Sequence, residues 1–422
     1  MKKITSILAF TMIFSTLVKA DAKWDTIAYF NQVVEDIKSF NGNLFVGGNL
    51  TKVNGNTSYW SAYYNGSSWT RQTNLIGGSG ISQFAIFDNK LYTVDAMDHS
   101  MGIGVSVWNG ATWDDGGSTT YSHSFIYADG NAYLYVIDFM GNIRRRTPIS
   151  GFTNFNSIIN TTGVSSIIRY NNKMIFAGVF TSINGVPANN IVQWDGTNWT
   201  ALGTGLVGGV DRMEVYNNEL YVCGKSLTSA GGVPINMIAK WNGTSWSGVG
   251  GGITSSCWNG IRDLLVINAG LLMVGDFTQV GGVNANNIAL WDGTKWIDYG
   301  ITHDDSFMSC AEVYNNQLYV GSFDFTKSHL YKLASLTGIN ENKNDILFSV
   351  FPNPVVDQLH INIPEITKNC TVSISNINGQ EMISKRMQQN DAVLDMSGWA
   401  SGIYFVKVVS DKAMTVKKII KK

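Results

Sequence analysis

The residues best suited to hydrolytic chemistry in this chain are aspartates in segments that should connect strands. Glycoside hydrolases place two carboxylic acids at a defined separation across the bond they cleave. Six aspartates stand in short groups that could supply such a pair, namely Asp95, Asp98, Asp114, Asp115, Asp304 and Asp305. Distance along the chain does not fix the distance between two carboxyl groups, and acids in loops are most often solvated. We therefore predict no catalytic residue.

Histidine and cysteine are the side chains that zinc and copper sites use most. The five histidines are His99, His123, His303, His329 and His360, and they form no close pair in the sequence. The four cysteines are Cys223, Cys257, Cys310 and Cys370, and their spacing matches no zinc pattern. The sequence therefore predicts no metal and no cofactor. We expect the cysteines to be buried small side chains, with one disulfide at most.

Aromatic side chains present large, flat, apolar faces on which sugar rings stack. Trp60, Tyr121 and Trp258 stand where no repeated pattern requires an aromatic residue. We treat these three residues as a candidate platform for a glycan or protein ligand.

Composition narrows the class of protein that must position these groups. The chain has 422 residues, of which 44% are hydrophobic and only 14% are charged, and its formal net charge is −1. Such a balance lacks the basic excess of nucleic-acid binding proteins. The 44 glycines and the 13 Trp, 17 Tyr and 20 Phe residues, with only 6 prolines, are typical of many short strands joined by tight turns.

A six-residue pattern of the form Trp-Asp-Gly-Thr-x-Trp recurs through the middle of the chain. Its copies span residues 64–69, 108–113, 194–199, 241–246 and 291–296. The copies are separated by roughly 45 residues or by twice that distance, so one copy has degenerated. Because Trp194, Trp241 and Trp291 recur at one position, we expect them to pack between repeats.

A second landmark precedes each of these turns and lies between two apolar runs. Its seven copies begin at Phe40, Phe87, Ala128, Tyr170, Tyr216, Ile267 and Tyr314, and they contain pairs such as Asn-Gly, Asp-Gly and Asn-Asn. These pairs tolerate the positive φ of tight hairpin turns. A glycine follows most of the landmarks, at Gly47, Gly178, Gly224, Gly275 and Gly321. We expect these glycines to mark a strand in a crowded centre.

Four antiparallel strands per repeat predict an all-β fold, a seven-bladed β-propeller over residues 23–339. The seventh copy lacks its closing strand, and the strand-like piece 23–30 precedes the first copy. We therefore predict that residues 23–30 complete the last blade and close the ring. The paired glycines, Phe-Thr, Asn-Ile-Ala and Trp-Asp-Gly-Thr-x-Trp resemble Kelch-type repeats of secreted and surface proteins.

Two enzymatic families with propeller folds fit the sequence poorly. Sialidases carry the pattern Ser-x-Asp-x-Gly-x-Thr-Trp, but residues 106–113 have Trp where the aspartate belongs, and Asp195 and Asp292 stand one residue too close to the glycine. The cross-linked Tyr–Cys pair and paired histidines of copper oxidases cannot be placed. The basic run 144–146 falls in the degenerate third copy, where strand alternation splits it between two faces, and we expect a solvated edge.

The N-terminal residues 1–22 read as a Sec signal peptide. Two lysines precede an apolar run from Ile4 to Val18, and small residues follow at Ala20 and Ala22, the two predicted cleavage positions. The apolar run is shorter than a membrane span, so we expect no transmembrane segment in the mature protein.

Residues 340–347 form a polar linker, and residues 348–422 alternate apolar and polar side chains as in a small immunoglobulin-like β-sandwich. This segment resembles the C-terminal sorting domain of the Bacteroidetes type IX secretion system. The matching residues are Phe351, Pro352, Asn353, Pro354, Asp357, Asn378, Gly379, Gln380, Asp395, Gly402 and Tyr404, with a Lys-rich last strand. The resemblance implies export through the periplasm and outer membrane, the secretion machinery and its sortase as partners, and a secreted or cell-surface product.

Three functions remain open at this level. The first is a non-catalytic surface or secreted module that binds a glycan or protein. The second is a polysaccharide hydrolase or lyase, for which the type IX route is a common export path. The third is a structural surface protein without a discrete ligand. The lack of a catalytic motif favours the first and the third, and we predict that the protein is not an enzyme.

Overall fold

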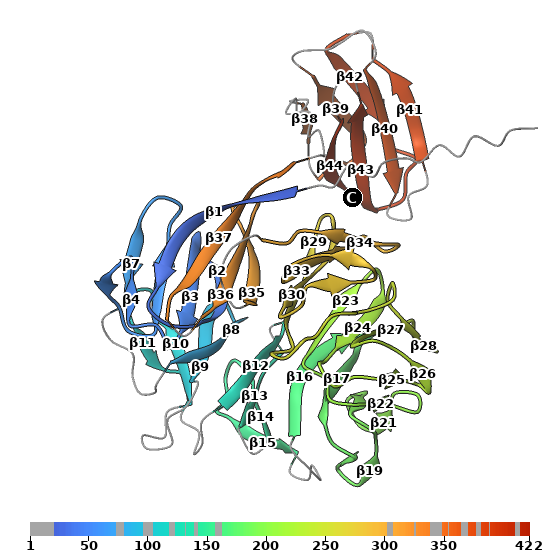
Figure 1. Ribbon diagram of the computed structural model, residues 1–422. Helices are drawn as coiled ribbons and strands as arrows, with labels where there is room; N and C mark the ends of the chain where they lie inside the picture. Colours follow the sequence, from blue (N-terminus) through green and yellow to red (C-terminus); the bar gives the residue numbers. More distant parts are fainter. Residues whose placement is uncertain are drawn as a thin grey trace, which may run out of the picture. The chain divides into compact units, whose positions relative to one another are not determined.

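The computed structural model describes residues 21–72, 80–95, 104–117, 123–130, 132–138, 142–156, 163–301, 307–324, 326–337, 348–352, 354–363, 370–376, 381–387, 389–409 and 414–422. Every regular element within these residues is a β-strand (Figure 1). The chain divides into two compact units, which comprise residues 1–338 and 339–422. None of the described residues forms a helix that could cross a membrane.

Unit 1 is built from antiparallel sheets of four main strands, which we number 1 to 7 along the chain. Sheet 1 contains β2 (Val34–Phe40), β3 (Asn43–Gly48), β6 (Ser61–Tyr64) and β7 (Trp69–Arg71). Sheet 2 contains β8 (Ile81–Phe87), β9 (Lys90–Asp95), β10 (Val105–Trp108) and β11 (Trp113–Asp115). Sheet 3 contains β12 (His123–Asp129), β13 (Tyr133–Asp138), β14 (Ile143–Arg146) and β15 (Thr153–Asn156).

The next three sheets repeat this order. Sheet 4 contains β16 (Gly163–Tyr170), β17 (Lys173–Val179), β20 (Ile191–Trp194) and β21 (Trp199–Ala201). Sheet 5 contains β23 (Arg212–Tyr216), β24 (Glu219–Cys223), β27 (Ile238–Trp241) and β28 (Trp246–Gly248). Sheet 6 contains β29 (Ile261–Ile267), β30 (Gly270–Gly275), β33 (Ile288–Trp291) and β34 (Trp296–Asp298).

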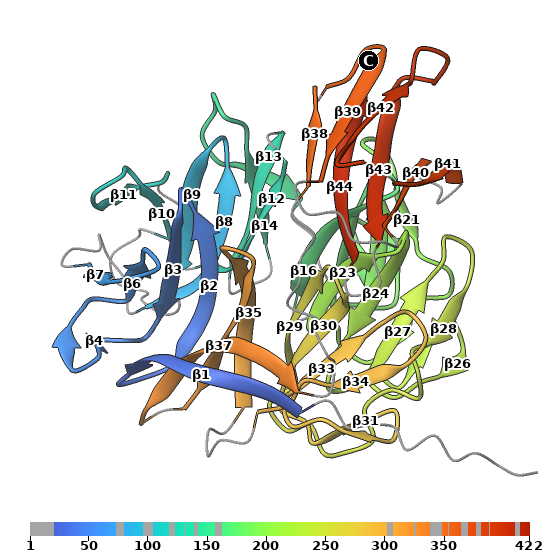
Figure 2. The same cartoon turned by 90° about the horizontal axis from the view of Figure 1, so that it is seen from above.

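Sheet 7 takes its strands from both ends of unit 1. It contains β35 (Phe307–Tyr314), β36 (Gln317–Phe323), β37 (Ser328–Thr337) and β1 (Asp21–Phe30), and β4 (Lys52–Val53) and β5 (Asn56–Thr57) extend it. The antiparallel ladder of β1 and β37 runs from the pair Asp21–Thr337 to the pair Phe30–Ser328, and Figure 2 shows the two strands side by side. The pairing predicted for residues 23–30 is therefore present.

Short strands lie in the connections between the second and third strands of sheets 4, 5 and 6 and, in one case, in the connection from sheet 4 to sheet 5. They are β18 (Ser182–Ile183), β19 (Val186–Pro187), β22 (Leu206–Val207), β25 (Ser229–Ala230), β26 (Val233–Pro234), β31 (Gln279–Val280) and β32 (Val283–Asn284).

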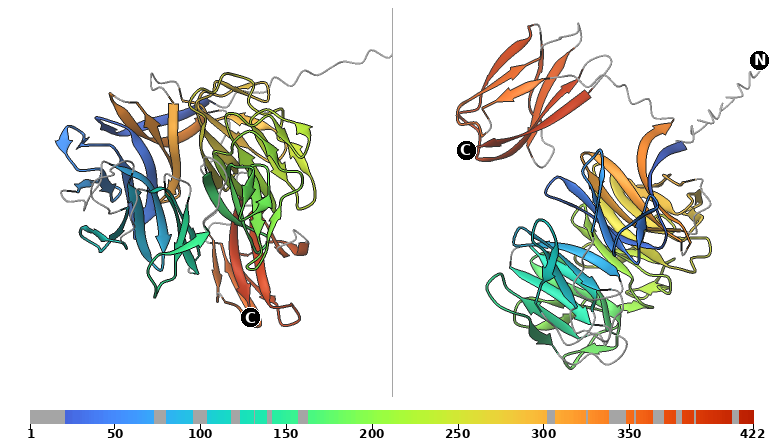
Figure 3. Two further views of the ribbon diagram at one scale, coloured as in Figure 1. Left: turned by 90° about the horizontal axis from the view of Figure 1, so that it is seen from below. Right: turned by 90° about the vertical axis from the view of Figure 1, so that its left-hand side faces the viewer.

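The first strands of the seven sheets form a closed circuit. Each first strand contacts that of the next sheet, and β35 contacts β2. Unit 1 is therefore a β-propeller-like ring, which Figure 3 shows from two further sides.

The hairpin turns between first and second strands have the predicted backbone. Asn171 and Asn172 have φ angles of 47° and 61°, and Asn315 and Asn316 have φ angles of 49° and 58°. Both residues of a type I′ turn need positive φ, which asparagine tolerates better than other side chains. The crowding predicted at the glycines is also present, since a Cβ on Gly224 would lie 2.1 Å from the Gly209 carbonyl oxygen.

The turns of the six-residue pattern are held by their second residue. Asp195 Oδ1 accepts hydrogen bonds from the amides of Thr197 and Asn198 at 2.8 and 2.7 Å. Asn242 Oδ1 accepts from Thr244 and Ser245 in the same way, at 2.9 Å each. Because either side chain supplies that acceptor, the repeat alternates between Asp and Asn.

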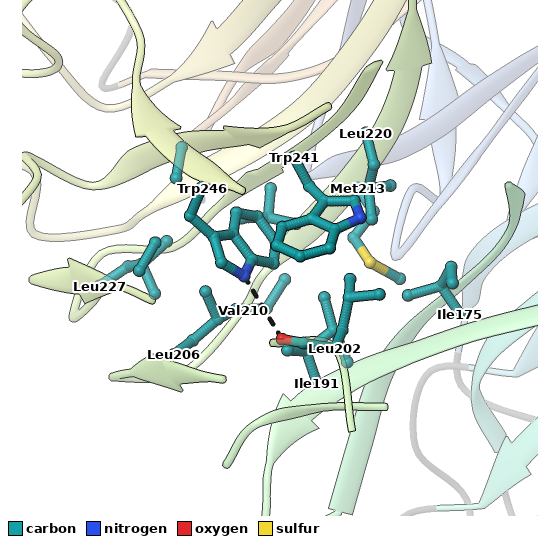
Figure 4. Close-up of a cluster of buried hydrophobic side chains, with 14 of the residues drawn as sticks. Ile175, Ile191, Leu202, Leu206, Val210, Met213, Leu220, Leu227, Trp241 and Trp246 are labelled. Carbon is teal, nitrogen blue, oxygen red and sulfur yellow. Dashed lines mark hydrogen bonds between the residues drawn. The ribbon is translucent and has the colours of Figure 1, made fainter. Parts of the chain in front are cut away.

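The recurring tryptophans pack between sheets, as predicted. Trp241 and Trp246 lie in one buried cluster with residues of sheets 4 and 5, and their ring centroids are 5.2 Å apart. Trp246 Nε1 also donates a hydrogen bond of 3.4 Å to the Leu202 carbonyl in the preceding repeat (Figure 4). Trp296 Nε1 makes the equivalent bond to the Val249 carbonyl at 3.3 Å.

The basic run of sheet 3 is not the solvated edge that we expected. Strand alternation does divide the three arginines between the two faces of sheet 3, but aromatic rings lie against both faces. The Arg145 guanidinium lies 4.3 Å from the Tyr133 ring centroid, and Arg146 lies 5.8 Å from that of Tyr92 in sheet 2. Arg146 pairs with Leu134, the position that Trp241 occupies opposite Leu220. Cation–π contacts therefore replace tryptophan packing in the degenerate copy.

Unit 2 is a sandwich of two antiparallel sheets. One sheet contains β38 (Ser349–Phe351), β39 (Gln358–Asn362) and β42 (Asp391–Asp395), and the other contains β41 (Glu381–Arg386), β40 (Thr371–Asn376), β43 (Gly402–Val409) and β44 (Met414–Lys421). Inward-facing residues of both sheets, including Leu359, Ile374 and Val406, form one buried core.

Candidate functional site

A cavity of about 360 Å³ occupies the centre of the ring and is lined by residues of all seven first strands. Its charged residues come from sheets 1, 5, 6 and 7. They are Asp36, Lys38, Arg212, Glu214, Asp263 and Glu312. Four carboxyl groups and two cations therefore share a narrow space between apolar walls.

We call this central cavity the channel. Several of its carboxylates form hydrogen bonds or ion pairs with a neighbouring sheet. Asp36 Oδ2 accepts a hydrogen bond of 2.7 Å from the Phe84 amide in sheet 2. Asp263 Oδ2 accepts one of 3.0 Å from the Ala311 amide in sheet 7. Lys38 Nζ lies 2.8 Å from Glu312 Oε2, which links sheet 1 to sheet 7. Sheet 7, which closes the ring, is therefore linked to sheet 6 by the Asp263 hydrogen bond and to sheet 1 by the Lys38–Glu312 ion pair.

Burial makes the carboxyl groups of Asp36, Glu214 and Asp263 harder to ionise. It raises the pKa of Asp36 and of Glu214 to about 7, and that of Asp263 to about 6. Amide hydrogen bonds and nearby cations oppose this rise but do not cancel it. Burial also lowers the pKa of Lys38, but Glu312 and the other carboxylates outweigh that effect and leave it raised.

These shifts predict that unit 1 is more stable in mild acid than in mild base. The pKa values of these groups in the folded protein exceed the ordinary values, which are 3.8 for Asp and 4.5 for Glu. The folded state therefore binds protons that the unfolded chain releases. This contribution to the free energy of unfolding is fully present when the pH is below the pKa values of the unfolded chain, and it is lost as the pH rises through 6 to 7. Glu214→Gln should therefore stabilise the protein by about 1–2 kcal/mol at pH 8 and by much less at pH 5.

Denaturant unfolding of the Glu214→Gln variant at several pH values measures this effect. Gln fits the site because Glu214 Oε1 accepts the Val215 amide at 2.8 Å, and an amide oxygen can accept the same bond. The control is Glu219→Gln, which removes a carboxylate that pairs with Lys240 at 2.8 Å outside the channel. We expect it to leave the pH dependence unchanged. Parallel pH profiles for the wild type and Glu214→Gln would contradict the account.

These channel residues were not predicted from the sequence, although the strands that carry them share a pattern. Asp36, Gln83, Arg212 and Asp263 each stand four residues before the last residue of their first strand. These four polar side chains stand at the same distance from the hairpin turn in strands that are otherwise largely apolar. Such a repeated position indicates that the four side chains line the same central space.

A second candidate site lies at the end of the ring where the first strands begin. A shallow hollow of about 450 Å³ is lined by Lys225, Ser226, Ser256, Cys257 and Trp258. The Trp258 side chain is 82% exposed, a high value for an aromatic residue. It therefore presents a free apolar face beside hydroxyl and ammonium groups.

The loop that carries Trp258 is held by carboxylates of neighbouring segments. Asp276 Oδ2 accepts hydrogen bonds from both the backbone and side-chain nitrogens of Asn259, at 2.9 Å each. Asp211 Oδ2 accepts the Lys225 amide at 3.0 Å on the other wall of the hollow. The exposed indole therefore stands on a positioned loop.

The other two residues of the proposed platform do not join Trp258. Trp60 is half-buried against the cluster that contains Phe45 and Trp113, at the junction of sheets 1 and 2. Tyr121 lies outside the described residues. Of the two residues that the structure describes, Trp258 is the one that presents an open aromatic face.

The remaining candidates form no shared site among the described residues. Asp114 and Asp115 are exposed on β11, whereas Asp98, Asp304 and Asp305 and the side chain of Asp95 are not described. His360 stacks on Phe351 in unit 2, and His329 lies beside Tyr331 in unit 1. Within the described part of the chain, no cluster of histidine, cysteine and carboxylate side chains could hold a metal ion.

The four cysteines are buried free thiols. Burial raises the pKa of Cys257 to about 11 and places that of Cys223 and Cys310 well above the usual range. Because the thiolate is the reactive form, these groups are poor nucleophiles.

The predicted sorting residues occupy both sheets of unit 2. Phe351 is exposed and stacks on His360 with centroids 5.2 Å apart. Pro352 and Pro354 follow, and the next residue, Val355, donates its amide to the Ile420 carbonyl at 2.7 Å. This motif is therefore tied to the last strand.

The other sorting residues stabilise turns. The Asp357 carbonyl accepts the Met396 amide at 2.7 Å, and Asp395 Oδ1 accepts the Ser397 amide at 2.9 Å, which lowers the pKa of Asp395. The buried Tyr404 donates its hydroxyl to the Ala400 carbonyl at 2.9 Å, and Gly402 pairs with Lys421. Asn353, Asn378, Gly379 and Gln380 lie outside the described residues.

The predicted cleavage positions fall at the start of β1. Ala20 lies outside the described residues, and Ala22 pairs with Leu336 in the β1–β37 ladder. Cleavage after Ala20 leaves β1 whole, whereas cleavage after Ala22 removes its first two residues.

Comparison with known families identifies the C-terminal segment. Residues 349–422 match the family described as a secretion system C-terminal sorting domain. This match indicates export to the cell surface or secretion, and interaction with the type IX machinery. A comparison of the whole sequence with curated proteins gives no match.

Solved structures with a similar fold share little sequence with this chain. One is described as PorZ, an essential bacterial surface component of the type IX secretion system of Porphyromonas gingivalis, with 14% identity and a TM-score of 0.50. The match covers 93% of this chain but 59% of PorZ. Another is the WD40 β-propeller domain of Doa1, with 12% identity, a TM-score of 0.49, and coverage of 73% of this chain and 96% of that domain.

Proposed function

We propose that this protein is a type IX cargo whose propeller binds a glycan or protein ligand outside the cell without transforming it. The observation that carries the binding role is Trp258, an indole that is 82% exposed on a loop fixed by Asp276. Exposure of a large aromatic side chain costs solvation free energy that burial against a ligand recovers. A sugar ring would stack on this face while Lys225 and Ser226 bond its hydroxyl groups.

The finer architecture is part of this proposal. We read sheets 1 to 7 as the seven blades of a Kelch-like propeller and unit 2 as an immunoglobulin-like sandwich. Residues 1–22 act as the Sec leader that brings the chain to the periplasm. Cleavage after Ala20 suits the β1–β37 ladder better than cleavage after Ala22.

The binding role predicts a local effect of removing the indole. Trp258→Ala in the full mature chain should weaken ligand affinity at least about tenfold, which corresponds to roughly 1.4 kcal/mol. Titration calorimetry with a glycan ligand measures the change. The matched control is Tyr59→Ala, which removes an aromatic side chain that is 46% exposed on a different segment, and its affinity should stay within twofold of wild type. Equal affinities for Trp258→Ala and wild type would exclude the hollow as the ligand site.

A second candidate function is a role in the secretion process itself. The likeness to PorZ over 93% of this chain supports this candidate, since PorZ is described as an essential surface component of that machinery. Deletion of the gene tests it: loss of export of other proteins with sorting domains would favour this role. Normal export of those proteins would leave the binding role as the better account.

A further inference from the structure

The hollow of the candidate binding site lies where two segments of unit 1 depart from the repeat. The first is segment 224–227 of sheet 5, whose counterpart in sheet 6 is segment 275–277. Met237 bonds both ends of segment 224–227, since its carbonyl accepts the first amide and its own amide donates to the last carbonyl, at 3.0 Å each. Asn287 bonds both ends of segment 275–277 in the same way, at 3.0 and 2.7 Å. Sheet 5 therefore has one residue more at this place, and residues 225–226 stand between the two ends.

The second departure is the connection from sheet 5 to sheet 6, which carries Trp258. Six residues separate Ile253 from Gly260 in this connection. Only two separate the equivalent residues, Leu206 and Gly209, in the connection from sheet 4 to sheet 5. Ile253 and Leu206 are equivalent because each donates its amide to a carbonyl of the preceding sheet's loop, at 3.1 and 2.9 Å. The two glycines are equivalent because the carbonyl oxygen of each crowds a glycine at the end of the second strand that follows. The longer connection is therefore not required for packing between repeats.

The two insertions are fixed and adjacent. Ser255 Oγ accepts the amides of Thr278 and Gln279 at 2.9 and 3.1 Å, which holds the longer connection against the loop of sheet 6. A Cβ on Gly260 would lie 3.8 Å from Cβ of Lys225 in the other insertion. The hollow is therefore a built surface, made by two segments that the repeat itself does not need.

This surface presents one cation. Lys225 is the charged residue among the described residues that line the hollow, and its side chain is exposed. None of the described residues forms an ion pair with Lys225. The carboxylates of Asp211 and Asp276, which hold the walls, are half-buried and accept amide hydrogen bonds. An ammonium group without a carboxylate partner therefore stands beside the open indole of Trp258.

We propose that the hollow binds a uronic acid residue of a polysaccharide. The inference rests on the binding role proposed above and names the class of ligand. The apolar face of the sugar ring stacks on Trp258, and the carboxylate, which is carried at the edge of such a ring, pairs with Lys225. Hydrogen bonds between charged groups are roughly twice as strong as neutral ones, so Lys225 gains more from a carboxylate than from a hydroxyl group. Ser226 Oγ accepts the Gly209 amide at 2.9 Å, and its proton can bond a ring hydroxyl group.

The test compares ligands that differ only in charge. The probes are oligosaccharides of galacturonate and of glucuronate, each as the free acid and as its methyl ester, titrated by calorimetry into the chain of residues 21–422. We expect one of the acids to bind at least about tenfold more tightly than its ester at low ionic strength, and added salt to reduce this preference. Lys225→Gln should remove the preference and Lys225→Glu should invert it. The matched control, Lys90→Gln, changes an exposed lysine on β9 and should keep the preference.

The outcomes separate the class of ligand from the binding role. Trp258→Ala should weaken the acid and the ester equally, because stacking does not depend on the carboxylate. Equal affinity of the wild type for acid and ester, no binding of either form, or a preference for the acid that persists in Lys225→Gln would overturn the uronic acid assignment. The proposed binding role itself would fail only if glycans of every class, neutral ones included, and protein ligands were not bound. Thermal unfolding of each variant shows that unit 1 is intact.

Discussion

A chain that lacks residues 21–30 will fail to form the closed ring of unit 1. Without β1, strand β37 becomes an exposed edge in sheet 7, and nine of its residues lose their antiparallel partner. Ala28 and Phe30, which are buried in the cluster joining sheets 7 and 1, would also be lost. We expect no cooperative thermal transition for unit 1 and rapid proteolysis at temperatures where the intact chain resists.

The reason for this large effect is that β1 carries the missing member of the repeat. Trp24 pairs with Leu333 of β37, just as Trp246 pairs with Trp241 within sheet 5. Its Nε1 donates a hydrogen bond of 3.1 Å to the Tyr299 carbonyl. Tyr299 stands three residues after Trp296, as Leu202 stands three after Trp199. The last copy of the tryptophan turn is therefore divided between the two ends of unit 1.

A single substitution tests this assignment without removing the strand. Trp24→Ala should lower the free energy of unfolding by about 3 kcal/mol, the usual cost of deleting a packed aromatic side chain. Trp258→Ala, which deletes an indole that is 82% exposed, should change it by less than about 0.5 kcal/mol. Guanidinium unfolding curves compare the two. A deletion of residues 21–30 that melts like the intact protein would contradict the closure.

The second large effect is expected from removal of the sorting segment. A chain without residues 346–422 should be trapped in the periplasm, because this segment matches the sorting domain family. Unit 1 should remain folded there, since the β1–β37 ladder is complete at the pair Asp21–Thr337. Cell fractionation with an antibody to unit 1 measures the distribution, and protease resistance of the periplasmic pool is the control for folding. Undiminished surface display of the truncated chain would refute the sorting role.

Features fixed by local backbone chemistry were predictable from the sequence. The asparagine pairs of the hairpins need positive φ, and they show it at Asn171 and Asn172. The tryptophans recur because the same inter-sheet cavity recurs, so their packing followed from their spacing. The closing strand was also predictable, because the seventh repeat lacked its fourth strand and the segment 23–30 had the pattern of a strand that belonged to no repeat.

Features that depend on which sheets face each other were not predictable. We expected Arg145 and Arg146 to be solvated because charged side chains usually face solvent, but their guanidinium groups lie over the rings of Tyr133 and Tyr92, respectively. The channel carboxylates are distant in sequence and meet only when the ring closes, as Lys38 and Glu312 do. Trp60 and Trp258 looked alike in the sequence, yet one packs against Phe45 and Trp113 while the other faces solvent.

The most direct test of the proposed binding role is a glycan and polysaccharide binding screen with a chain that comprises residues 21–422. Each glycan that is retained should afterwards be analysed by chromatography for shortened products. We expect retention of one glycan class, loss of that retention in Trp258→Ala, and no change in the length of the glycan. Shortened products would show that the propeller is an enzyme, and retention that does not depend on Trp258 would show that the ligand binds elsewhere.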